Sequence, residues 1–116
     1  MNVLEWLSSF FSRRSMASRL YNRGLAKAKK RDHQGAIADY SSTIGMRVLP
    51  PDVLAMVLYH RALGFFAIGD EGKGEDDLKA VLAMHESLVN VKTMARQKLA
   101  STESQANTRN TRASRR

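Results

Sequence analysis

Cysteine is absent from this 116-residue chain, and proline occurs only twice. Without cysteine, neither a disulfide framework nor a thiolate metal site can form. No apolar run reaches the roughly 20 residues that a transmembrane helix needs. Residues 1–12 are apolar but lack the basic start and small-residue cleavage site of a secretory signal. These absences predict a cytoplasmic protein. A chain of 116 residues has room for one small hydrophobic core.

Charge of either sign is unevenly distributed along the chain. Residues 1–31 carry eight basic residues against one acidic residue, a balance of +7. Residues 32–90 carry four against nine (−5), and residues 91–116 carry seven against one (+6). Basic ends around an acidic middle favour contacts within the fold, or with an acidic partner, a nucleic acid or an anionic membrane.

Apolar residues recur at three- and four-residue intervals, which predicts an all-α fold. Asp32 and Asp70 are expected to cap helix N-termini. Helices are expected over residues 2–12, 17–30, 33–45, 51–68, 71–82 and 88–100. Because residues 101–116 contain no large apolar side chain, they are expected to be disordered. The predicted organisation is an N-terminal amphipathic helix (1–16), a helical domain with a C-terminal capping helix (17–100) and a disordered basic tail (101–116).

Two stretches of the chain match each other at a distance of 38 residues. The matches are LYNRG at 20–24 with LYHRA at 58–62, Asp32 with Asp70, and Asp39 with Asp77. A period of this size is typical of helical repeat proteins.

The two copies resemble the tetratricopeptide repeat (TPR), a helix–turn–helix unit of about 34 residues. The small and large residues of that pattern fall at Gly24, Ala36 and Tyr40 in copy one and at Ala62, Gly74 and Leu78 in copy two. The resemblance covers about residues 17–85. It implies two TPR-like units in a right-handed superhelical stack, flanked by N- and C-terminal helices. Copy one departs from the pattern because it is longer and has Lys27 at a position that is often aromatic.

An arginine and an aspartate recur with the repeat, as Arg23 with Asp39 and as Arg61 with Asp77. An active site seldom needs two copies of its charged pair. The repetition therefore favours a structural role over catalytic or anion-binding groups, and the TPR resemblance implies that each arginine pairs with its aspartate across the two helices of one unit.

No group of residues in the sequence predicts an enzyme. His33, His60 and His85 fall on different expected elements and lack the paired spacing of a metal site. The segment 69–74 is glycine-rich but lacks the GxxxxGK[ST] pattern of a phosphate-binding loop. We therefore expect no catalytic residues, no metal and no cofactor.

The TPR resemblance implies that the first helix of each unit lines a concave groove, which binds a peptide or protein segment. By position, the groove residues are Tyr21, Asn22, Leu25 and Lys29 in copy one and Tyr59, His60, Leu63 and Phe66 in copy two. Tyr21 and Tyr59 are expected side by side, where tyrosine offers rigid, amphipathic contact area. Two interpretations stay open: a partner binds these rings, or an added helix covers them as core.

The ends of the chain suggest two alternative functions. Trp6, Phe10 and Phe11 precede Arg13 and Arg14, as in a helix that lies on a membrane surface. This segment could instead pack on the domain, enter its own or a neighbour's groove, or meet a partner protein. The first alternative is therefore a membrane-peripheral adaptor anchored by residues 2–14.

The second alternative is a nucleic-acid-associated protein that uses its basic ends. The tail carries four arginines at positions 109, 112, 115 and 116, without aromatic residues between them. Because such aromatics stack on single-stranded bases, their absence argues against specific nucleic-acid binding. The main prediction is a non-enzymatic protein-interaction scaffold, with self-association open.

Overall fold

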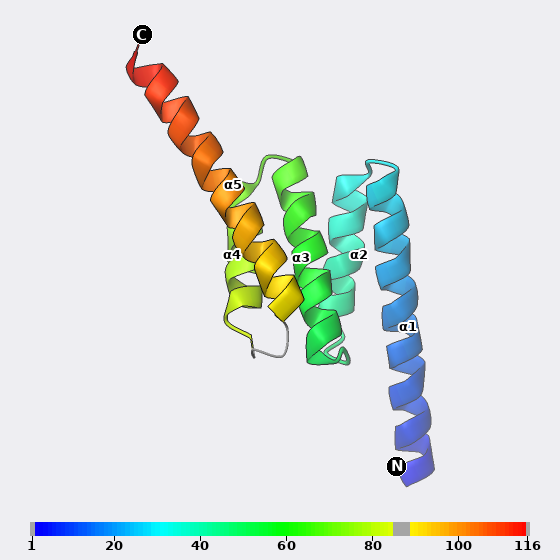
Figure 1. Cartoon of the computed structure of the whole chain (residues 1–116). Helices are drawn as coiled ribbons and strands as arrows, with labels where there is room; N and C mark the ends of the chain where they lie inside the picture. Colours follow the sequence, from blue (N-terminus) through cyan, green and yellow to red (C-terminus); the bar gives the residue numbers. More distant parts are fainter. Residues whose placement is uncertain (1, 85–88, 116) are drawn as a thin grey trace.

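The computed structural model describes residues 2–84 and 89–115. Within these ranges the chain is all-helical, without a β-strand, and its helices pack in neighbouring pairs (Figure 1). The helices are α1 (Val3–Lys29), α2 (His33–Gly45), α3 (Pro51–Ala67), α4 (Glu71–Leu82) and α5 (Val89–Ser114). His85 and the predicted helix start at Leu88 lie outside the described residues.

The boundaries of α2, α3 and α4 follow from local capping chemistry. The Asp32 carboxylate accepts a hydrogen bond from the Gly35 backbone N–H at 3.0 Å, and Asp70 accepts one from Lys73 N–H at 3.3 Å. These bonds satisfy N–H groups that lack a partner in the first turn. Pro51 opens α3 at a position where its missing N–H costs nothing. The predicted N-caps and the start of α3 are confirmed.

The helices enclose two small cores. The first core is centred on Ala36, Tyr40 and Val57, between α1, α2 and α3. The second core lies between α3, α4 and α5. Its buried residues are Ala55, Leu58, Ala62, Leu78, Val81, Val91 and Ala95. Helices α1 and α2 form the first hairpin and α3 and α4 the second, and α5 packs on the second hairpin.

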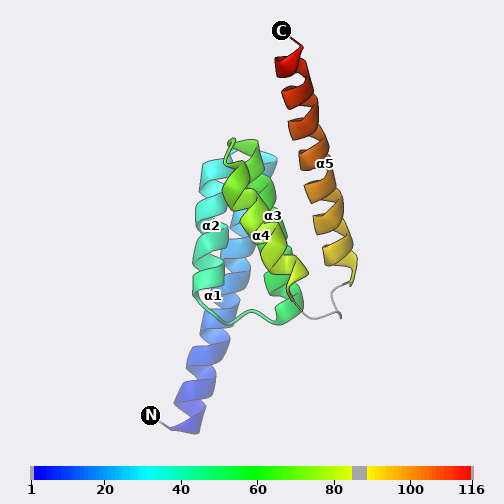
Figure 2. The same ribbon diagram turned by 90° about the vertical axis from the view of Figure 1, so that its left-hand side faces the viewer.

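Helix α1 is continuous from Val3 to Lys29, so the predicted boundary between residues 16 and 17 is wrong. No glycine or proline, the residues that most often interrupt a helix, separates the two predicted helices. Asn2 caps the start, because its side-chain oxygen accepts a hydrogen bond from Glu5 N–H at 2.8 Å. The N-terminal half of α1 projects beyond the ends of α2 and α3 (Figures 1 and 2).

Residues 101–114, predicted to be disordered, form the C-terminal half of α5. The segment lacks glycine and proline, and its threonine hydroxyls donate to carbonyls one turn earlier, as Thr102 does to Lys98. Arg109 of α5 pairs with Glu71 of α4 at 3.1 Å. The two projecting helix ends give the molecule a longest dimension of 69 Å. A lack of apolar residues therefore did not prevent helix formation here.

In each hairpin a small residue of the first helix corresponds to a larger residue of the second helix in the repeat pattern. The two hairpins use different residue types at these two positions. A Cβ built on Gly24 would lie 2.7 Å from a ring carbon of the buried Tyr40. The equivalent residues of the second hairpin are Ala62 and Leu78, both fully buried. The first hairpin thus combines glycine with a large ring, and the second combines alanine with a smaller side chain.

We expect the effect of Gly24→Ala on stability to change sign with the residue at position 40. Beside Tyr40, the added methyl group overpacks the core at a cost of roughly 1–3 kcal/mol, which exceeds or cancels its helix-propensity gain of about 1 kcal/mol. Beside Tyr40→Leu, the same change should stabilise the chain. Denaturant unfolding of the four proteins measures this coupling. Equal effects in both backgrounds would contradict it.

Candidate functional site

Each hairpin is held by a bidentate arginine–aspartate pair. Arg23 donates to the two Asp39 carboxylate oxygens at 2.9 and 2.8 Å. Arg61 donates to Asp77 at 2.8 and 2.7 Å. Both aspartates are buried, and the hydrogen bond from Arg23 lowers the pKa of Asp39 below its usual value. The predicted ion pairs are confirmed, and each joins the two helices of its hairpin.

The two pairs differ in their additional partners. In the first hairpin, Lys27 Nζ lies 3.1 Å from Asp39, so this departure from the TPR pattern supplies a second cation. In the second, Arg61 also donates to Ser41 Oγ at 3.2 Å, and this bond joins α3 to α2. Arg61 therefore holds the second hairpin together and links it to the first.

The eight predicted groove residues divide into three groups. Tyr21 and Leu25 pack on the first core, and the His60 ring lies 6.0 Å from that of Tyr21. Tyr59 and Phe66 pack on the second core, where Lys98 of α5 lies 5.1 Å above the Phe66 ring. The remaining three residues are the half-buried Leu63 and the exposed Asn22 and Lys29.

The expected pairing of Tyr21 with Tyr59 is therefore not what the structure shows. Among the described residues, Tyr21 makes its ring contacts with Tyr40 and His60. Tyr59 packs against the core that α5 closes. The interpretation that an added helix covers the rings thus applies to Tyr59 and Phe66. Tyr21 and His60 form the contact between the first helices of the two hairpins.

Burial keeps the rings of this contact uncharged. It raises the pKa of Tyr21 and lowers that of His60. Burial also raises the pKa of Tyr40 to about 12, and its hydroxyl has no hydrogen-bond partner among the described residues. The surface between α1 and α3 is therefore neutral at pH 7, with Lys29 and Asn22 exposed on α1 nearby.

The stability of the chain should fall on mild acidification, in part because of His60. Its pKa is lower in the folded chain than the usual value of about 6.5, so the unfolded chain binds the proton first. The stabilisation that comes from keeping His60 neutral is present above pH 6.5, and it is lost as the pH falls toward the pKa of His60 in the folded chain. We expect His60→Gln to flatten the unfolding midpoint between pH 7 and 5. A slope as steep as that of the wild-type chain would contradict this assignment.

The N-terminal half of α1 carries the largest exposed apolar side chains. Val3, Leu4, Trp6 and Phe11 are 56–76% exposed. Trp6 stacks on Phe10 at 5.8 Å, and the Arg14 guanidinium lies 5.8 Å from the same phenylalanine ring. These four exposed side chains therefore neither pack on the domain nor enter the chain's own groove. The sequence had already marked this segment by its aromatic residues.

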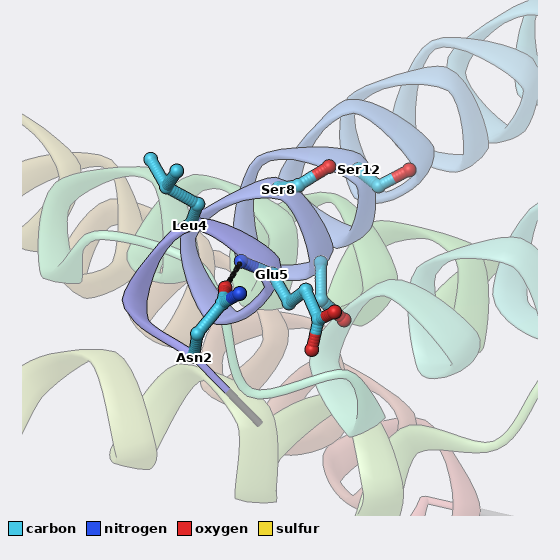
Figure 3. A pocket seen from close by; sticks show the side chains of 6 residues that line it. Asn2, Leu4, Glu5, Ser8 and Ser12 are labelled. Atoms are coloured by element: carbon cyan, nitrogen blue, oxygen red, sulfur yellow. Dashed lines mark hydrogen bonds between the residues drawn. The ribbon is translucent and has the colours of Figure 1, made fainter.

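The surface hollows described below, all lined by residues of 2–84 and 89–115, are open rather than enclosed. One lies along the first turns of α1 and is lined by Asn2, Leu4, Glu5, Ser8, Ser9 and Ser12 (Figure 3). All its side chains come from a single helix, and Asn2 is already engaged as the N-cap. Another hollow likewise has only α5 residues, and a third lies beside the Arg61–Asp77 pair.

Over residues 2–84 and 89–115, no three histidine or acidic side chains gather as a metal site. Within the same ranges, no helix combines enough length and hydropathy to cross a bilayer. No family model, curated protein or solved structure matches this chain.

Proposed function

We propose that this chain is a non-enzymatic protein-interaction module. In this proposal its two hairpins are TPR-like units in a right-handed superhelical stack. They bind a peptide or protein segment along the face formed by their first helices, α1 and α3. The observation that carries the proposal is the contact between the half-buried Tyr21 and His60 rings, 6.0 Å apart on those two helices.

The chemistry of this face favours a particular kind of peptide. Tyr21, Leu25 and His60 provide neutral, partly exposed contact area, which suits an aromatic or aliphatic side chain. Lys29 lies exposed on the same helix and suits an acidic residue beside that side chain. Because α5 closes over Tyr59 and Phe66, the binding face is smaller than the eight residues predicted from sequence.

Selection from a random peptide library displayed on phage tests the proposal. We expect selected peptides to combine an apolar or aromatic residue with acidic neighbours. Lys29→Glu and His60→Ala should each weaken their binding, measured by isothermal titration calorimetry. Lys79→Glu makes the same charge change on the exposed side of α4 and should leave affinity unchanged. Failure to select peptides, or equal losses for Lys29→Glu and Lys79→Glu, would overturn the proposal.

A further inference from the structure

The projecting start of α1 is apolar on the side that faces its own hairpin. We call residues 3–14 the arm. Val3, Phe10, Ala17 and Gly24 are spaced by seven residues, so they lie on one side of the helix, offset by only about 20° per step. Ala17 and Gly24 are buried in the hairpin. The apolar side of the arm therefore continues the surface by which α1 packs on its neighbours.

The arm and the body together form a step. Arg13 donates to the Met46 carbonyl at 2.6 Å, which holds the root of the arm against the loop between α2 and α3. Beyond this contact the arm extends past the ends of α2 and α3 (Figures 1 and 2). Its apolar side and the base of the body thus form two walls of one open corner.

The shape of this corner selects its occupant. A flat bilayer that approached the apolar side of the arm would meet the body, which lies on that same side of α1. A single helix, about 10 Å in diameter, fits beneath the body and along the arm. The arm of a second copy has that size and carries a complementary apolar side.

We propose that two copies of this chain dimerise through their arms, which pack antiparallel about a two-fold axis. A two-fold interface brings the same surface of both copies together, so each apolar side is covered by the other. Each arm spans roughly 18 Å at 1.5 Å per residue. The start of one arm then reaches the base of the other body, with Val3 level with Arg14 and Leu7 level with Phe10.

The exposed apolar area is sufficient for a reversible dimer. Val3, Leu4, Trp6 and Phe11 are more than half exposed, and Leu7 and Phe10 are partly exposed. At on the order of 100 Å² for each of the four exposed side chains and about half of that for each of the two partly exposed ones, the arm offers about 500 Å² per copy and about 1,000 Å² per dimer. This lies at the lower limit of specific interfaces, so we expect dissociation in the micromolar range.

The position of the body favours antiparallel over parallel arms. Parallel arms with facing apolar sides would bring the two bodies to the same level on the same sides, where they would collide. Glu5, the only acidic residue of the arm, lies seven residues before Ser12 and so faces away from the apolar side with it.

Sedimentation velocity over about 2–200 μM protein, which brackets a micromolar dissociation constant, tests dimerisation. We expect the wild-type chain to dimerise and Phe11→Asp to weaken the dimer more than about tenfold. Ser12→Asp places the same charge one residue later, on the polar side, and should leave the dimer unchanged. A wild-type chain that stays monomeric, or equal weakening by both variants, would overturn the proposal.

Disulfide crosslinking tests the orientation, because the natural chain has no cysteine. A mixture of Val3→Cys and Arg14→Cys chains should form a mixed disulfide under mild oxidation, and Val3→Cys alone should crosslink poorly. Efficient crosslinking of Val3→Cys with itself would indicate parallel arms and reject this geometry. Vesicles of phosphatidylcholine and phosphatidylserine test the alternative occupant, a membrane surface. Flotation of a chain that is monomeric in solution, abolished by Phe11→Asp, would assign the surface to a membrane instead.

Discussion

Arg61→Met is expected to lower the free energy of unfolding by about 3–5 kcal/mol, because it leaves the buried Asp77 carboxylate without its cation. The Arg61 side chain is only 21% exposed, so water replaces little of the lost interaction. The change also removes the bond to Ser41 that joins the hairpins. Denaturant unfolding followed by circular dichroism measures the loss.

Arg23→Met is the matched control, since it removes the equivalent arginine from the first hairpin. Its side chain is 60% exposed, and Lys27 remains 3.1 Å from Asp39 after the change. We therefore expect a smaller loss than for Arg61→Met. The double change Arg61→Met/Asp77→Leu should recover much of the stability, because it removes the stranded charge as well. Equal losses for the two single variants would show that burial does not distinguish the pairs.

Local chemistry explains why the middle of the fold could be predicted. Asp32 and Asp70 start helices through hydrogen bonds to residues three positions later, and Pro51 starts another. These signals act within one helical turn, so the sequence contains all of the necessary information. The arginine–aspartate pairs were predictable for a different reason. Their repetition after 38 residues favoured a structural role, and the TPR resemblance implied the pairing between helices.

The two ends were predicted less well because a change in composition was treated as a change in structure. At residues 12–16 the apolar pattern weakens, but no residue there interrupts backbone hydrogen bonding, so α1 continues. In residues 101–114 the lack of large apolar side chains removes a packing surface. It does not remove the helix propensity of alanine, glutamine and arginine.

The candidate groove depended on information that no local pattern contains. Tyr59 and His60 are neighbours in sequence, and the repeat matched Tyr59 with Tyr21. Only the position of α5, which packs against the second core, determines that Tyr59 and Phe66 are partly covered. His60, one residue later on α3, then contacts Tyr21 across the hairpins. Whether Tyr59 or His60 lies next to Tyr21 therefore depends on the packing of helices that are distant in sequence.

Leu78→Ala is expected to destabilise the chain by about 2–5 kcal/mol, the range for removing a fully buried leucine. Leu78 is 0% exposed and belongs to the core that α3, α4 and α5 share. The cavity would therefore lie beneath α5 as well as within the second hairpin. Thermal unfolding should show a lower midpoint, and hydrogen exchange should show faster opening of residues 91–99 of α5.

Ile68→Ala is the control for Leu78→Ala, because it removes an aliphatic side chain that is already 42% exposed. We expect a loss below about 1 kcal/mol, since little apolar surface leaves the core. The comparison bears on function, because α5 covers Tyr59 and Phe66 only while it stays packed on this core. If Leu78→Ala loosens α5 without unfolding the first hairpin, Tyr59 and Phe66 become accessible on α3. Equal losses for the two variants would mean that the second core does not hold α5 in place.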